Sequence, residues 1–438
     1  DTYNDISITL YEWVDTNGGE YQTITVPSSD ITSSFSPTFD TNTSGTYIQT
    51  YTITYNGETY TTTRTVIIST PYGNSSWIQQ GVEKSGIATW PGTQYGKSVA
   101  ISGDGTVMAF GAYENASGTF TDGGSIHIYK YDNGAWVNYG YNDNKIVGNP
   151  AEYTGQSIGL NYDGTKIVFG ANNYDGAKGA VRVFGINNDG SGWSGLLDLV
   201  GVNSYDQTGR SVAINSTGNI IAFSTPGYNT DSNNHNSGRI NVYIQGSGWT
   251  QLGTDNAMKG ETGILAGAHM QLGLTQISLS NDGYTIAVSS RTWGVVKIYK
   301  YISGDWQQIG NTIDEDNYNN SGEGVSISLN GDGTRIAVGT YQAHDNTNNY
   351  NEAGAVRVYD YNGINNWVKI GNTIYGDSSS FRLGRQVSLT DDGTILAIGS
   401  SGDSTGCVKT YYYSEAGYIN FGNTITLGGT QHGMGENV

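Results

Sequence analysis

The sequence contains a single cysteine, Cys407, so no disulfide can form within the chain. Charged residues make up only 13% of its 438 residues, and 20 Lys and Arg stand against 39 Asp and Glu. The net charge of −19 disfavours binding to nucleic acid or to anionic lipid, because both would be repelled. No run approaches the roughly 20 apolar residues of a membrane helix, so direct membrane insertion is not expected.

A helix-favouring composition is also lacking. Glycine, with 64 copies, and tyrosine, with 33, stand among Thr- and Val-rich runs, which is typical of strands and turns. Aromatic residues at 12%, together with many Val and Ile, supply enough apolar side chain for a core and argue against disorder. The sequence therefore predicts an all-β protein.

The N-terminal part, residues 1–70, is predicted to be a small β-sandwich, with a linker over 71–76. Two strand-like runs flank Asn56-Gly57, a dipeptide that tolerates the positive φ of a tight hairpin. The stretch from Gly45 to Ile68 resembles the closing strands of bacterial immunoglobulin-like modules of surface proteins. This resemblance implies an Ig-like fold for the N-terminal unit.

From Trp77 to the end the chain repeats itself, and the repeat determines the predicted fold. Each repeat has two apolar strands joined by an Asp-Gly or Thr-Gly turn, then a third strand and a strand that opens with an aromatic residue. Four short antiparallel strands at a fixed period predict the blade of a β-propeller over residues 77–438. The opening aromatics are Trp77, Trp136, Trp193, Trp249, Trp306, Trp367 and Tyr418.

The number of blades is left open between six and seven, because the chain holds six complete repeats and an incomplete one. The final residues Gly435-Glu436-Asn437-Val438 parallel Gly384-Arg385-Gln386-Val387, the entry to an earlier repeat. This slightly favours seven blades; the alternative is a six-bladed ring closed by its terminal strands. In the third strands a basic residue stands between apolar ones, as at Arg182, Lys297 and Arg357, so we expect that face to meet water.

The blade pattern, Gly-x-Ser-Val followed by Asp-Gly-Thr, Ala-x-Gly-Ala and Gly-x-Val-x-Val-Tyr, resembles degenerate FG-GAP repeats of the integrin-α type. Such repeats are common in surface proteins of marine microbes and large viruses. The resemblance implies a non-enzymatic protein of an extracellular, cell or virion surface that serves adhesion or structural assembly. The alternatives are a carbohydrate-binding propeller lectin and a polysaccharide-acting propeller enzyme.

No catalytic or metal-binding pattern is evident in the sequence. Each Asp-Gly turn, such as Ser102-Gly103-Asp104-Gly105, carries isolated or adjacent carboxylates, whereas Ca²⁺ requires six to eight converging oxygens. A tight turn accounts for the Asp-Gly pairs without a metal. The five histidines show no ligand spacing, and no nucleophile elbow, phosphate loop or carboxylate pair stands out. We therefore predict no catalytic residue, no metal and no cofactor.

Loop length indicates where a partner would bind. The connections from second to third strand, and from the aromatic strand to the next repeat, are long, and in an up-and-down blade both emerge on one face. Their aromatic residues stand among Asn, Asp and Ser, which suits stacking on sugars or contact with protein. We expect a protein or glycan of a cell or particle surface, or a second copy of the chain, to bind this long-loop face. The candidate binding residues are Trp90, Tyr113, Tyr174, Tyr228 and Trp293.

Overall fold

The structure is a computed structural model. It describes residues 8–14, 20–26, 31–36, 45–55, 58–68, 77–82, 84, 95–112, 123–140, 145–228, 237–254, 258–260, 272–290, 294–314, 325–402, 406–414 and 417–426. The chain divides into two compact units, Asp1–Ser75 and Ser76–Val438. Within the described ranges the regular structure is β-strand apart from one short helix, α1 (Tyr174–Ala177), which confirms the all-β prediction.

The described part of the first unit forms two small sheets. In one, β1 (Ile8–Val14) pairs with β2 (Glu20–Val26); in the other, β4 (Gly45–Tyr55) lies between β3 (Ile31–Ser36) and β5 (Glu58–Ile68). Strands β4 and β5 pair antiparallel with Tyr55 opposite Glu58, which agrees with the predicted hairpin. Two such sheets do not show an Ig-like sandwich, and the boundaries 1–70 and 71–76 stay a prediction.

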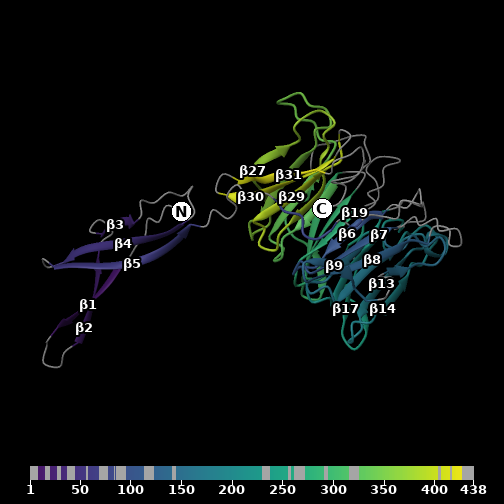
Figure 1. The fold of residues 1–438 in the computed structure, drawn as a ribbon, viewed down its shortest axis with the longest axis horizontal. Coiled ribbons are helices and arrows are strands. Elements are labelled where there is room, and N and C mark those ends of the chain that lie inside the picture. The colour runs from purple at the N-terminus through teal and green to yellow at the C-terminus, as the bar shows by residue number, and fades with distance from the viewer. Residues whose placement is uncertain are drawn as a thin grey trace. The chain divides into compact units, whose positions relative to one another are not determined.

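The second unit is a six-bladed β-propeller in which each sheet is one blade (Figure 1). Blade 1 consists of β6 (Tyr95–Ile101), β7 (Val107–Ala112), β8 (Ser125–Asp132), β9 (Ala135–Asn138) and β10 (Lys145–Val147). Blade 2 consists of β11 (Ile158–Leu160), β12 (Lys166–Ala171), β13 (Ala180–Ile186) and β14 (Trp193–Val200). Blade 3 consists of β15 (Val212–Ile214), β16 (Ile220–Thr225), β17 (Arg239–Gln245) and β18 (Trp249–Gln251). Blade 4 consists of β19 (Leu272–Leu279), β20 (Thr285–Ser290), β21 (Val295–Ile302), β22 (Asp305–Gln308) and β23 (Ile313–Asp314). Blade 5 consists of β24 (Val325–Leu329), β25 (Arg335–Thr340), β26 (Ala355–Tyr361) and β27 (Trp367–Tyr375). Blade 6 consists of β28 (Leu383–Leu389), β29 (Ile395–Ser400), β30 (Cys407–Ser414) and β31 (Gly417–Ile425).

The strands of each blade follow one another as an antiparallel meander, from the axis outward. Blades 1 and 4 split their outermost strand into two pieces that both pair with the third strand. The propeller predicted from the repeat is therefore confirmed. The slight preference for seven blades is not confirmed, because the described residues of this unit form six sheets.

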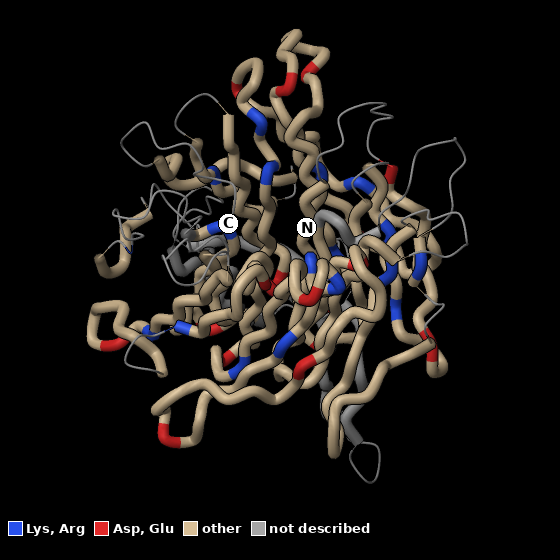
Figure 2. Tube along the Cα trace, turned by 90° about the vertical axis from the view of Figure 1, so that its right-hand side faces the viewer, with Lys and Arg blue, Asp and Glu red and all other residues tan. Residues whose placement is uncertain are grey.

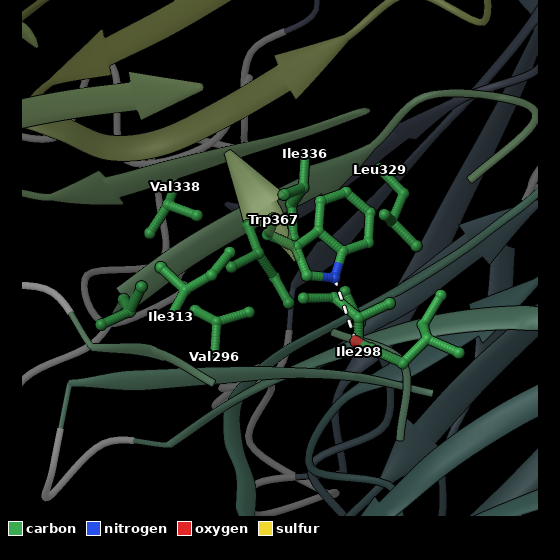
Figure 3. Packing of buried hydrophobic residues seen from close by; sticks show 11 residues of the cluster. Val296, Ile298, Ile313, Leu329, Ile336, Val338 and Trp367 are labelled. Carbon is green, nitrogen blue, oxygen red and sulfur yellow. Dashed lines mark hydrogen bonds between the residues drawn. The ribbon is translucent and has the colours of Figure 1, made fainter. Parts of the chain in front are cut away.

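The hydrophobic core lies between the blades. Each of five apolar clusters joins two successive blades, from blades 1 and 2 to blades 5 and 6. Between blades 4 and 5, the Trp367 ring packs among buried residues that include Val296 and Ile298, and its Nε1 donates to the Ile309 carbonyl oxygen at 3.1 Å (Figure 3). The same bond recurs from Trp193 to Tyr139 and from Trp306 to Leu252. The aromatic residue of the fourth strand thus fixes its blade to the preceding one.

The small residues of the repeat allow blades to approach closely. A Cβ on Gly170 in β12 would stand 1.8 Å from the carbonyl oxygen of Gly209, at the entry to blade 3. The hydroxyl of Ser157 donates to this same oxygen at 2.9 Å. The arrangement is repeated one blade earlier by Gly111, Gly155 and Ser98. The Gly-x-Ser motif is therefore a contact motif between blades.

The Asp-Gly turns are linked to one another by backbone hydrogen bonds, which form a belt around one face. Turn residues donate to the next turn along the belt at 2.8 to 3.1 Å, from Tyr162 to Ser216, then to Asn281, Gly331 and Asp391. The carboxylate of each turn is bonded locally; that of Asp392 accepts hydrogen bonds from Thr390 and Thr394, which hold its pKa below the ordinary value. The turn motif is accounted for by these local bonds.

Candidate functional site

Where the structure describes both long connections of a blade, as in blade 2, they lie side by side, as predicted. In blade 2 the loop between β12 and β13 meets the connection to blade 3, where Thr208 N donates to the Lys178 carbonyl at 3.0 Å. The parallel bridge of Gly179 with Thr208 recurs in blade 1 at Gly124 and Thr154. These paired loops form the long-loop face, opposite the Asp-Gly turns.

Two of the five aromatic candidates, Tyr174 and Tyr228, are described by the structure. The others, Trp90, Tyr113 and Trp293, lie outside the described residues. Tyr174 begins α1, and the guanidinium carbon of Arg182 lies 5.3 Å from its ring centroid. The Tyr228 ring has Arg239 at 4.4 Å and the Lys259 Nζ at 5.1 Å. Both half-buried rings already make cation–π contacts, so a ligand would have to share or displace these cations. Their role in binding stays a prediction.

The basic residues of the third strands are buried, so the expectation that they face water is wrong. Lys297 and Arg357 expose only 7% and 8% of their surface. Arg182 shows how such a charge is accommodated, because the connection from blade 1 folds over it and supplies Glu152. Lys409 in blade 6 forms the equivalent ion pair with Asp377. Figure 2 accordingly shows many basic residues along strands and several acidic ones at the tips of turns.

The Glu152 carboxylate is the centre of a buried polar network. Its Oε2 lies 2.9 Å from the Arg182 Nη1, and Asn149 and Thr154 donate further hydrogen bonds to it. Burial would raise its pKa, and the hydrogen bonds from Arg182 and Asn149 outweigh this, so the pKa of Glu152 lies below the ordinary value. A carboxylate satisfied in this way positions a loop and is unsuited to accept a proton from a substrate.

His127 in β8 stands at the same strand position as Arg182 and Arg357. Burial lowers its pKa to about 4, and the nearby Lys145 adds to this effect. Its Nε2 lies 3.2 Å from the Ser125 hydroxyl oxygen. The residue therefore lies within the blade and remains neutral at physiological pH.

This depressed pKa predicts an acid-sensitive stability. Between pH 6.5 and 4 the unfolded chain binds a proton at His127 that the folded chain does not, so acid favours unfolding. We expect the free energy of unfolding to be about 2 kcal/mol lower at pH 5 than at neutral pH from this residue alone. Urea denaturation from pH 7 to pH 5 should show a smaller loss in His127→Gln than in the unmodified protein. Equal losses in both would contradict the assignment.

The first strands of all six blades line a central channel with a cavity of about 550 Å³. Its walls are mainly aliphatic, with Ser and Gln between, and no ionisable side chain occurs among the residues described there. The hydroxyls of Ser278 and Ser328 accept hydrogen bonds from the backbone of the next blade. Acid–base and nucleophilic catalysis require a titratable group beside the substrate, so the described channel lining offers no such chemistry.

A larger cavity, of about 810 Å³, lies between blades 1 and 2 on the face of the Asp-Gly turns; we call it the turn-face groove. Blade 1 contributes Lys130 and Tyr139, with the lysine Nζ 5.2 Å from the centroid of the Tyr139 ring. Burial, with smaller contributions from Asp163 and Asp104, raises the pKa of Tyr139, so its hydroxyl stays protonated. The blade 2 lining is Thr165, Lys166, Gly185, Ile186, Asn187, Asn188, Asp189, Gly190, Ser194 and Leu196.

The sequence did not predict this groove, because a partner was expected on the opposite, long-loop face. The hairpin between β13 and β14 holds six residues, Asn187-Asn188-Asp189-Gly190-Ser191-Gly192, where blade 1 has only Asn133-Gly134 between β8 and β9. The extra length raises a wall of amide and carboxylate side chains beside blade 1. This difference in hairpin length is the signal that could have indicated the groove.

A smaller cavity, of about 270 Å³, lies in blade 6 beside Cys407, Lys409 and Asp377. Burial raises the pKa of the Cys407 thiol, so it is protonated and a poor nucleophile. Lys409 is held by its ion pair with Asp377. Across the described ranges, no group of three or more His, Cys, Asp or Glu could hold a metal ion.

No protein-family model and no curated protein matches the chain. Among solved structures, a Bacteroides fragilis protein described as a "putative 6-phosphogluconolactonase" is 13% identical over 91% of this chain and 94% of that chain, with a TM-score of 0.49. The periplasmic gluconolactonase of Pseudomonas aeruginosa is 12% identical over 92% and 98%, with a TM-score of 0.49. TolB of Acinetobacter baumannii is 12% identical over 93% and 81%, with a TM-score of 0.41.

These comparisons correct the predicted function. The structures that resemble the chain include lactonase propellers, and they contradict the role of a non-enzymatic surface or virion protein in adhesion or assembly. The resemblance to FG-GAP repeats is confirmed only as far as the propeller architecture. At identities of 12–13% and TM-scores below 0.5, these likenesses assign no activity to the chain. No helix in the described ranges has the length and apolar character needed to cross a membrane.

Proposed function

We propose that the turn-face groove binds a small polyhydroxylated molecule that carries a negative charge, such as a sugar acid or a sugar phosphate. The observation that carries the proposal is the composition of the groove, which combines lysine, amide and hydroxyl groups with an apolar wall of Ile186 and Leu196. Specific small-molecule sites have this character: an apolar lining with a few polar groups that fix the orientation of the ligand.

The charge of the ligand follows from the two lysines. Lys130 is exposed and extends over the Tyr139 ring. Lys166 also lines the groove, and its Nζ donates to the Gly218 carbonyl and to Gln245 Oε1 of blade 3. The exposed Asp189 stands on the hairpin, so the anionic end of a ligand is directed toward the lysines and its hydroxyls toward Asn187 and Asn188.

The ionisable groups of the groove form no nucleophile–base pair among the hydrogen bonds described, so the proposal is binding. We keep the prediction that the chain is not an enzyme only as part of this proposal of binding.

A setting outside the cytoplasm, which the sequence composition favours, is part of the same proposal, and the periplasmic gluconolactonase is compatible with it. We also propose an Ig-like module over residues 1–70 and FG-GAP-like repeats over 77–438, on the sequence patterns given above.

Calorimetric titration with 6-phosphogluconate, gluconate and glucose tests the proposal. We expect the two anions to bind more tightly than glucose, and Lys130→Ala to weaken their binding about tenfold or more, because a charge-assisted hydrogen bond is worth about 1.5–3 kcal/mol. Lys300→Ala is the matched control, since Lys300 is the exposed lysine at the same strand position of blade 4, outside the groove.

Three results would overturn the proposal: no binding of either anion, equal affinity for glucose, or an equal loss in Lys300→Ala. Incubation of the same protein with gluconolactone, followed by measurement of acid release, checks for turnover. Hydrolysis that is lost in Lys130→Ala would place a reaction in the groove, whereas binding without acid release would support a binding role.

A further inference from the structure

The segment from Trp77 to Gly81 makes the contacts that the outer strand of one more blade would make. Trp77 contacts blade 6 as Trp193 contacts blade 1: its ring centroid lies 5.8 Å from that of Phe421, and the Trp193 centroid lies 5.6 Å from Tyr139. Its Nε1 donates to Thr410 Oγ1, which in turn donates to the Phe421 carbonyl. This two-step link replaces the direct bond that Trp193 makes to Tyr139.

The other end of the segment contacts blade 1 in the same manner. The Trp136 Nε1 donates to the Gln80 carbonyl at 3.0 Å, as the Trp193 Nε1 donates to the Tyr139 carbonyl. Gly81 lies against the Trp136 ring as Gly140 lies against the Trp193 ring. The segment therefore stands between blades 6 and 1, with the contacts that an outer strand makes on both sides.

The inner part of this position is uncovered. In every other blade the first strand packs on the preceding blade, and in blade 5 Ile327 and Leu329 expose only 1% and 6%. The equivalent residues of blade 1, Val99 and Ile101, expose 39% and 62%. The five apolar clusters of the described residues join blades 1 to 6 in succession, and none of them joins blade 6 to blade 1.

The turn face gives independent support. A Cβ on the turn glycine of a blade would meet the preceding blade, at 2.5 Å for Gly164 and 2.7 Å for Gly333. A Cβ on Gly105, the turn glycine of blade 1, would meet nothing within 4 Å. Among the described turns, the belt of backbone bonds runs from blade 1 to blade 6 without a bond from Asp391 back to blade 1.

We propose that the space between blades 6 and 1 is the seat of a seventh sheet, whose outer strand is Trp77–Gly81 and whose three inner strands come from outside the described residues. The exposed residues define the occupant: it has three antiparallel strands of this repeat, and its alternate aliphatic residues contact Val99 and Ile101. The described repeats already form their own blades, so the occupant lies outside the described residues. Pairing and covering such an apolar sheet face removes a surface that otherwise promotes aggregation.

The test uses a polypeptide that corresponds to residues 383–414 with Cys407→Ser, which carry the three inner strands of blade 6. The full chain bearing Ile101→Cys and Cys407→Ser is mixed with it, and the rate of thiol labelling is measured. We expect at least a tenfold slower labelling, together with a 1:1 complex by native mass spectrometry and a rise in Tm. Leu329→Cys, the same strand position in blade 5, is the control for a covered site and should label slowly with or without the added polypeptide.

A polypeptide of the same composition with scrambled order should leave Ile101→Cys as reactive as before. Should the three-strand polypeptide aggregate, the same residues are joined after Val438 through a Gly/Ser linker, and protection of Ile101→Cys is measured in that chain against a scrambled extension. Unchanged labelling in both formats overturns the proposal. Ile101→Cys that is already as slow as Leu329→Cys in the protein alone overturns it as well.

Discussion

Gly170→Ala should lower the free energy of unfolding by about 3 kcal/mol, near the upper end of the usual cost of overpacking a well-packed core. The new Cβ would stand 1.8 Å from the Gly209 carbonyl oxygen and 2.8 Å from its carbon. Both atoms belong to the backbone of blade 3, so no side-chain rotation can relieve the clash, and the two blades must separate. The separation also weakens the hydrogen bond from the Ser157 hydroxyl to the same carbonyl.

Urea denaturation of Gly170→Ala against Gly195→Ala measures this effect. Gly195 lies in β14 of the same blade, and a Cβ there would meet the Phe184 ring at 3.6 Å, an ordinary contact distance. We expect the control to change stability by no more than about 0.5 kcal/mol, since it removes the flexibility of glycine without creating a clash. A loss in Gly170→Ala no larger than that of the control would mean that the blades can adjust at little cost.

The fold could be predicted from the sequence because its signals repeat in every blade. Ser157, Gly170 and Asp163 each belong to a motif that recurs in most blades, and each makes a contact between or within blades. A motif that recurs in this way is visible without a structure. The same repetition explains why these residues say little about function, since their side chains are engaged in contacts between or within blades.

The candidate site could not be predicted because it depends on single differences between blades. The turn-face groove needs one long hairpin in blade 2 and one lysine in blade 1, which are far apart in the sequence. Likewise, the alternation of apolar and polar residues in the third strand predicted that Arg182 faces water. In the structure, Glu152 from the connection that leaves blade 1 covers Arg182 and pairs with it. Local patterns report which strand face is apolar, whereas a loop from the preceding blade decides whether a charge on that strand is covered.

Glu152→Gln should be the second large loss, about 3 kcal/mol at pH 7, because removing one partner of a buried ion pair leaves the other charge uncompensated. The Glu152 side chain exposes 2% and that of Arg182 13%, so water cannot replace the lost carboxylate. The remaining partner of Arg182, Asp198, is 3.2 Å away and mostly exposed. The double variant Glu152→Gln/Arg182→Met should recover part of the loss, since it removes the stranded charge.

Glu352→Gln is the matched control, because Glu352 and Arg382 also pair at 2.9 Å but with side chains 39% and 43% exposed. An exposed pair contributes at most about 1 kcal/mol, so urea denaturation should separate the two variants clearly. The stability that Glu152 provides is present above pH 4.5 and is lost as the pH falls through its lowered folded-state pKa. Equal losses in both variants would show that burial of the Glu152–Arg182 pair adds nothing, and that the connection over Arg182 is held by its backbone bonds alone.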